Sequence, residues 1–143
     1  MVIHPRKAAK ADCALLGELN HQLIRDEGHR NRMTVPQLQK RMRGWLAGEY
    51  AAILFEKGAE VVAYALYREE PDQIYLRQLF VQRHCRRRGL GRQAFGILRS
   101  QIWPAHKRLT VQVLSANATA VAFWKSVGFQ EYSLTLEIMP LVT

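Results

Sequence analysis

The segment that most constrains the fold is a short basic loop between an apolar strand and a helix. Leu79-Phe80-Val81 ends a run of residues typical of a strand, and a helical pattern begins at Gly89-Leu90-Gly91. Arginines crowd the residues around this junction, at Arg83, Arg86, Arg87, Arg88 and Arg92. A chain with this order of elements is expected to combine strands and helices in one sheet-based fold.

This strand–loop–helix segment has the features of a phosphate-binding site. Backbone N–H groups at a helix N-terminus lack partners inside the helix, and the helix dipole adds partial positive charge. Gly89 and Gly91 let a ligand approach the backbone closely. The segment is not a Walker A loop, because no Gly-Lys-Ser/Thr follows, and the dinucleotide fingerprint lacks its third glycine. The alternative is an ordinary helix start within a solvated arginine run.

The rest of the chain alternates between helical and strand periodicity. Helices are predicted over residues 10–26, 34–46, 89–103 and 116–127. Strands are predicted over residues 2–8, 50–56, 60–67, 73–81, 109–114 and 129–139. This order predicts a mixed sheet with helices on both sides and disfavours a nicotinamide-type doubly wound fold.

Length and composition are those of a single domain over residues 1–143. No apolar run approaches the roughly 18 residues that cross a bilayer, and the N-terminus lacks a signal-peptide pattern. No membrane partner is therefore expected. Cys13 and Cys85 do not predict a disulfide, so a cytoplasmic location is expected. The formal net charge of +9 favours anionic partners such as polyphosphates or nucleic acid.

Two ordered motifs resemble those of the GNAT superfamily of N-acetyltransferases. Arg86-x-x-Gly89-x-Gly91 resembles its Arg/Gln-x-x-Gly-x-Gly/Ala signature, and the segment from Asn117 to Phe129 is similar to its second motif. The resemblance covers essentially the full chain and is strongest over residues 75–129. It implies an α/β (α+β) fold with a mixed, mostly antiparallel central sheet of six to seven strands flanked by about four helices.

The resemblance also implies an enzyme that moves an acetyl group from acetyl-CoA to a primary amine by direct attack. Backbone amides from Arg87 to Arg92 are expected to hold the coenzyme A pyrophosphate, and the strand edge before them to pair with the pantetheine arm. The implied cofactor residues are Leu79, Phe80, Val81, Arg86, Arg87, Arg88, Gly89, Leu90, Gly91, Arg92, Asn117, Phe123 and Trp124. No metal is expected, because no Cys/His spacing suggests a site.

Two positions depart from the family pattern. Trp124 stands where members often carry a tyrosine thought to protonate the leaving thiolate. Indole N–H is only a weak donor, so Trp124 is expected to pack against the cofactor instead. Tyr75 stands where some members place a glutamate base, and it is not an obvious base at neutral pH. Glu27 and Tyr75 are the candidate catalytic residues.

The acceptor is predicted to bind between the loop that joins the first two helices and the third strand of the predicted hairpin sheet. The candidate substrate-binding residues are Asp26, Glu27, His29, Asn31, Tyr75 and Arg77. Carboxylates and a histidine in the loop can attract an ammonium group and take its proton. Arg77 can anchor an anionic group of the acceptor. A solvated loop and an internal salt bridge from Arg77 to Glu27 or Glu69 are the alternatives.

The acceptor's identity, as a small-molecule or a protein amine, is left open by the sequence, and so is the oligomeric state, a homodimer included. Two other functions compete with acetyl transfer. One is a basic nucleic-acid-binding module that uses the Arg83–Arg92 stripe. The other is a catalytically inactive coenzyme A sensor that keeps the fold, because fold does not guarantee function.

Overall fold

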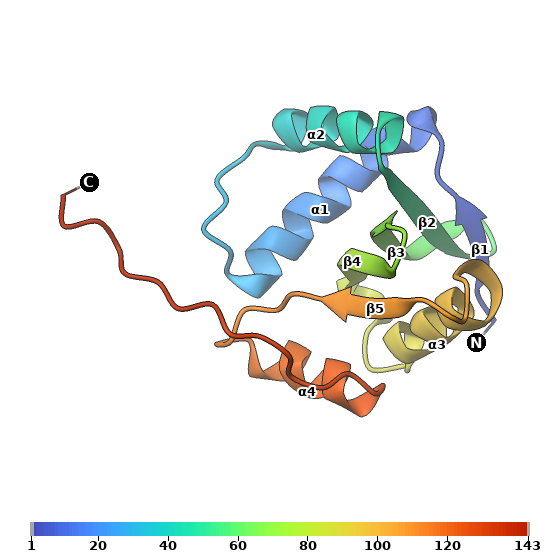
Figure 1. Ribbon diagram of the computed structural model, residues 1–143. Coiled ribbons are helices and arrows are strands. Elements are labelled where there is room, and N and C mark those ends of the chain that lie inside the picture. Colours follow the sequence, from blue (N-terminus) through green and yellow to red (C-terminus); the bar gives the residue numbers. More distant parts are fainter. Residues whose placement is uncertain (1, 143) are drawn as a thin grey trace. The chain divides into compact units, whose positions relative to one another are not determined.

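The protein is described here by a computed structural model that covers residues 2–142. Its contacts group into two compact units, one ending at Gln112 and the other beginning at Val113. The first unit contains one sheet of five strands in sequential order (Figure 1). The strands are β1 (His4–Lys7), β2 (Tyr50–Lys57), β3 (Glu60–Glu69), β4 (Gln73–Val81) and β5 (Arg108–Val111). Neighbours from β1 to β4 are antiparallel, and β5 runs parallel to β4.

Three helices belong to this unit, and their ends follow local capping rules. They are α1 (Cys13–Glu27), α2 (Val35–Ala47) and α3 (Leu90–Ile97), which continues into a π-helical turn over Leu98–Ile102. Gly28, at φ 68°, ends α1 in the left-handed conformation that glycine adopts without strain. Thr34 begins α2 with a capping box to Gln37, as its position before Pro36 predicts. No helix within residues 2–142 is long and apolar enough to span a bilayer.

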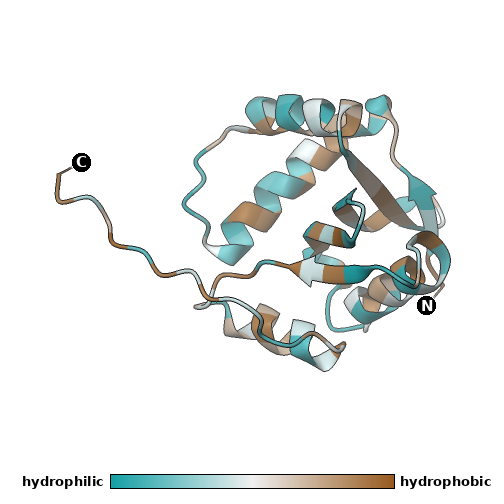
Figure 2. Ribbon diagram, in the orientation of Figure 1, coloured by the Kyte–Doolittle hydropathy of each residue, from teal (hydrophilic) through white to brown (hydrophobic). Residues whose placement is uncertain are grey.

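Side-chain alternation gives the sheet two covered faces. Tyr50, Ala52 and Leu54 of β2 cluster with Leu16 and Met42 from the first two helices, so α1 and α2 cover one face. On the opposite face, which we call the α3 face, the ring of Tyr67 lies 5.4 Å from Trp103, the residue that follows the α3 segment. The strand β2 is hydrophobic along most of its length, as expected for a strand covered on both sides (Figure 2).

A β-bulge interrupts the alternation in β4. Leu66 is opposite Gln78 and Tyr67 is opposite Leu76, which leaves Arg77 as an extra residue without a counterpart on β3. One extra residue reverses the side-chain alternation on its strand. Arg77 therefore lies on the face that α1 and α2 cover, although strict alternation from Phe80 would place it on the α3 face.

The edge of β4 is only partly paired. β5 is hydrogen-bonded to residues 73–76, and within the described chain no strand pairs with the same edge from Arg77 to Val81. Main-chain N–H and C=O groups along this stretch are open to an extended ligand that adds as a strand. This is where the sequence places the pantetheine arm.

The second unit contains α4 (Ala118–Ser126) and a C-terminal segment without regular structure (Figure 1). The prediction of a strand over residues 129–139 is wrong for this structure, so the sheet has five strands and not six or seven. Apolar residues do alternate at Tyr132, Leu134, Leu136 and Ile138, yet these side chains are exposed. A strand is stable only when a neighbour satisfies its main-chain groups, and this segment makes none of the ladder hydrogen bonds.

Candidate active site

The basic loop turns sharply into α3. Arg87 has φ 65° and Gly89 has φ 71°, so two residues of the loop are left-handed. The conformation is uncommon for a side chain such as that of arginine and costs about 1–2 kcal/mol. Turns that combine left- and right-handed residues aim successive N–H groups at a common point. Gly89 has no side chain to cap α3, so a bound anion could take the place of a side-chain cap at this helix start.

Asp26, at the end of α1, holds the basic loop in place. Its carboxylate accepts hydrogen bonds from Arg83 at 2.5 Å and from Arg86 at 2.7 Å. Arg86 also donates from Nε to the carbonyl of Val81 at 2.9 Å. Burial acts to raise the pKa of Asp26, but the hydrogen bonds from Arg86 and Arg83 outweigh it and hold that pKa below its usual value. The Asp26 carboxylate, a predicted acceptor ligand, is therefore engaged by the loop in this structure.

The imidazole of His84 contacts the side chain of Glu60 and does not point to the start of α3. Its Nε2 lies 2.7 Å from a carboxylate oxygen of Glu60 on β3. The buried thiol of Cys85 completes a group whose three donor atoms all lie within 4.8 Å of one another. Within residues 2–142 this is the one group of His, Cys, Asp or Glu side chains that could hold a metal ion.

The loop after α1 brings Glu27 and His29 together on the acceptor side. Their side chains are 2.9 Å apart, and both are partly open to solvent. Asn31 accepts a hydrogen bond from the N–H of Met33 at 2.8 Å and so shapes the loop. Burial raises the pKa of Tyr64, and the nearby charge of Glu27 raises it further. Glu27 therefore acts electrostatically on the buried hydroxyl of Tyr64, which donates to Gln78 of β4 at 2.8 Å.

Tyr75 lies at the paired end of β4. Its hydroxyl donates to the side chain of Gln112 at 3.2 Å. Burial is the main cause that raises the pKa of Tyr75 above that of a free phenol. The phenol is therefore protonated at neutral pH, so it can donate a proton or a hydrogen bond but cannot act as a base.

Arg77 makes neither of the salt bridges that the sequence offers as alternatives. Its guanidinium stacks on Trp45 of α2, with 4.7 Å between Cζ and the ring centroid, and donates to the hydroxyl of Tyr50 at 3.4 Å. Arg41, one turn before Trp45, stacks on the same ring at 4.3 Å. Sequence reasoning missed Arg41 and Trp45. Their i, i+4 spacing on one helix was the available signal.

In the second unit, the predicted cofactor residues form a local aromatic group. The ring of Trp124 lies 5.0 Å from Phe123 and 5.3 Å from Phe129, both edge-to-face. Asn117 caps α4, because its side-chain oxygen accepts from the N–H of Ala120 at 3.1 Å. These contacts explain the local fold of α4.

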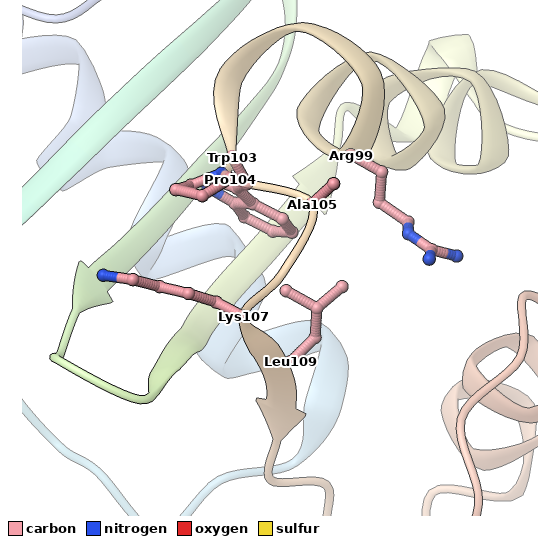
Figure 3. Close-up of a pocket in the computed structure, with 6 residues that line it drawn as sticks. All are labelled: Arg99, Trp103, Pro104, Ala105, Lys107 and Leu109. Atoms are coloured by element: carbon pink, nitrogen blue, oxygen red, sulfur yellow. The ribbon is translucent and has the colours of Figure 1, made fainter.

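A small hollow lies between the end of the α3 segment and the start of β5. It has a volume of about 70 Å³, and Trp103, Pro104 and Leu109 are among its lining residues (Figure 3). Lys107 extends from the start of β5 toward the turn between β3 and β4, where it binds Glu69 at 2.7 Å. The hollow is too small for a cofactor the size of coenzyme A.

The fold and the site combine a partly unpaired strand edge with a basic, left-handed turn before a helix, features that suit a phosphate-bearing ligand. A family model described as "Acetyltransferase (GNAT) domain" matches residues 16–137. The chain belongs to this family and is an acyl-CoA-dependent acetyltransferase. This confirms the resemblance read from the two motifs and does not favour the nucleic-acid-binding module or the inactive sensor. A search of curated proteins finds no match.

Solved structures share the fold at low sequence identity. A possible acetyltransferase from Clostridium difficile 630 has a TM-score of 0.79 and 17% identity, with 100% of both chains covered. An aminoglycoside N-acetyltransferase in complex with CoA has a TM-score of 0.77 and 13% identity, covering 98% of this chain and 95% of that one. A predicted acetyltransferase with acetyl-CoA from Clostridium acetobutylicum has a TM-score of 0.73 and 17% identity, covering 96% of each.

Proposed function

We propose that this protein transfers the acetyl group of acetyl-CoA to a primary amine, with the pyrophosphate held at the start of α3. The observation that carries the proposal is the continuity of the unpaired β4 edge with the left-handed turn before α3. An extended pantetheine arm on that edge leads directly to the N–H groups that suit a pyrophosphate. Two relatives in the fold were solved with CoA or acetyl-CoA, which supports the same ligand here.

The chemistry is a direct displacement at the thioester. The neutral amine nitrogen attacks the carbonyl carbon, and a backbone N–H near residues 79–81 stabilises the oxyanion. The carbon–sulfur bond then breaks, and coenzyme A leaves as its thiolate. Glu27, with His29 beside it, accepts the proton that the amine loses. The protonated phenol of Tyr75 serves as a hydrogen-bond donor on the acceptor side.

Several assignments rest on the family resemblance. Asn117, Phe123 and Trp124 are proposed to contact the pantetheine arm and its sulfur end. Residues 1–143 are proposed to act as one catalytic domain in the cytoplasm, in keeping with two free cysteines. A homodimer is compatible with this reaction and is not required by it.

The test is the substitution of a glycine in the first turn of α3. Gly91→Glu places a carboxylate next to the N–H groups that should hold the pyrophosphate. Because like charges repel, we expect at least about a tenfold loss of coenzyme A affinity by calorimetry, with the melting temperature retained. Dephospho-coenzyme A should also bind more weakly than coenzyme A, because nearby arginines are expected to hold the 3′-phosphate.

Gly96→Glu is the matched control in the same helix. Gly96 is exposed, and a side chain there meets nothing within 4 Å. It introduces the same charge and length away from the first turn, so affinity should match that of the parent protein. Unchanged affinity in Gly91→Glu would show that the pyrophosphate is held elsewhere.

A further inference from the structure

Two arginines of the acceptor side share one aromatic ring. Arg41 on α2 and Arg77 at the bulge of β4 both stack on Trp45, with Cζ at 4.3 Å and 4.7 Å from the ring centroid. We call Arg41 and Arg77 the arginine pair. The indole partly offsets their charge through cation–π attraction and fixes the position of both guanidiniums.

The positive charge of this pair is not neutralised by the protein. Within the described residues, no carboxylate forms an ion pair with either guanidinium. Burial, and then the nearby charge of Arg77, lower the pKa of Arg41. Arg68 provides the contrast, because it stacks on the neighbouring Tyr50 and Tyr75 but is paired with Glu70 at 3.0 Å. Arg68 is a satisfied cation, whereas the arginine pair lacks an anion.

Buried polar atoms next to the pair also lack partners. Arg41 donates to the side-chain oxygen of Asn20 at 3.0 Å, and Asn20 is fully buried on α1. Nε of Arg41 and Nδ2 of Asn20 are buried, and neither has a hydrogen-bond partner in the structure of residues 2–142. Both are donors, so the missing partner is an acceptor.

An open hollow adjoins Arg41, one member of the arginine pair. It has a volume of about 450 Å³ and is lined by Met33, Gln37, Lys40 and Arg41. Lys40 adds a third positive charge. Burial is the main cause that raises the pKa of the nearby Tyr64, while the charge of Glu27 raises that pKa and the charge of Arg41 lowers it. A negative charge on Glu27 and a positive charge on Arg41 therefore both lie near the buried Tyr64 on the acceptor side.

We propose that the arginine pair binds a carboxylate of the acceptor, so that the acceptor is an amine that also carries an anionic group. The inference rests on the proposed acetyl transfer and names its substrate class. Two guanidiniums offer planar donor sets that match a carboxylate, and a bound carboxylate neutralises the charge of the pair. The carboxylate end binds at Trp45, and the amine end is drawn toward Glu27.

The first experiment measures acetyl transfer to matched acceptors. These are a series of ω-amino acids of increasing length, the corresponding amides and the corresponding aminoalkyl phosphates. We expect the best amino acid to have a KM at least about tenfold below that of its amide, because charge-assisted hydrogen bonds are lost in the amide. Arg41→Met and Arg77→Met should each raise KM about tenfold or more for amino acids, leaving kcat and the amides nearly unchanged.

Two variants distinguish anchoring from a structural role. Arg77→Lys keeps the charge but loses the planar fork, so its KM should fall between those of the parent and Arg77→Met. Arg68→Met removes a neighbouring stacked arginine that already has its carboxylate, so it should affect all acceptors alike. Equal KM changes for amino acids and amides in Arg41→Met and Arg77→Met would overturn the proposal. A lower KM for aminoalkyl phosphates than for amino acids would overturn the carboxylate assignment and identify a phosphate as the anionic group of the acceptor.

A second measurement does not depend on turnover. Glutarate, a dicarboxylate without an amine, should raise the melting temperature of the parent protein and not that of Arg41→Met. Stabilisation by glutarate without acetylation of any amine would leave the anion site standing and refute the proposed function. Acetylation of amines and amino acids with equal KM, and no effect of glutarate, would refute the anion site alone.

Discussion

Asp26 holds the basic loop next to the end of α1 in this structure. It lies at the end of α1 and binds two arginines of the basic loop. Arg86 in turn holds the carbonyl of Val81, the last residue of β4. The position of the loop therefore depends on a carboxylate that lies 60 residues before Arg86 in the chain.

Asp26→Asn should loosen the loop and weaken cofactor binding. The amide keeps the shape but loses the charge, so we expect a severalfold rise in the Kd for coenzyme A. The free energy of unfolding should fall by about 1 kcal/mol or less, because Arg83 is largely exposed and the pair is screened. Isothermal calorimetry with coenzyme A and thermal unfolding measure the two effects.

The control for this substitution is Asp12→Asn. Hydrogen bonds from Arg6 lower the pKa of Asp12, as those from Arg86 and Arg83 lower that of Asp26. A lowered folded-state pKa gives stability that is present above the unfolded value of about 3.9 and is lost as pH falls through the folded value. Each variant should therefore differ from the parent in stability at neutral pH and converge with it in acid. An equal loss of coenzyme A affinity in both variants would contradict the anchoring role of Asp26.

Among the secondary-structure elements, α4 carries the clearest departure from the family pattern. Trp124 occupies the position of the expected tyrosine and packs edge-to-face between Phe123 and Phe129. Its contacts within this unit are those of a packing residue. A thiolate is a fair leaving group, so a general acid at this position is helpful but not indispensable.

Trp124→Phe should lower turnover by less than about tenfold, because the aromatic wall remains and only the N–H is lost. Trp124→Tyr should match or exceed the parent, since the phenol adds a proton donor. Steady-state kinetics at saturating acetyl-CoA measure both. A general acid contributes roughly a hundredfold to ten-thousandfold. A loss of that size in Trp124→Phe, with unchanged cofactor binding, would identify the indole as a proton donor after all.

Across the chain as a whole, the net charge of +9 is spread over sites with different partners. Some cations are structural, such as Arg6 with Asp12 and Glu56. Others lie at the basic loop, where Arg83 and Arg86 share a single carboxylate. The arrangement leaves an excess of positive charge at the loop, where the sequence predicts a polyphosphate.

Cofactor binding should therefore weaken with salt. Raising the salt from about 0.1 M to about 1 M shortens the screening length from about 10 Å to about 3 Å. We expect the affinity for coenzyme A to fall by about tenfold or more, while pantetheine, which carries no phosphate, should bind with little salt dependence. Equal salt dependence of the two ligands would show that the arginines do not act on the phosphates.

Local pattern was sufficient to predict most of the fold. The period of apolar residues predicted the helices and the first five strands, and Thr34 and Asn117 marked helix starts that the structure retains. Gly89 was predicted to let a ligand approach the backbone, which stays a prediction, and its left-handed φ is a feature that the structure adds. These features depend on neighbours a few residues apart, which is why they can be recognised in one dimension.

The acceptor side was decided by contacts between distant parts of the chain. The bulge at Arg77 depends on the register between β3 and β4, and no local signal fixes it. Arg77 reaches Tyr50 across 27 positions, and Asp26 reaches Arg86 across 60. The alternation from Tyr132 to Ile138 predicted a strand that the structure does not form, because pairing depends on a neighbour and not on the pattern alone. Chemistry that depends on which side chains meet follows from packing, and only the folded chain sets it.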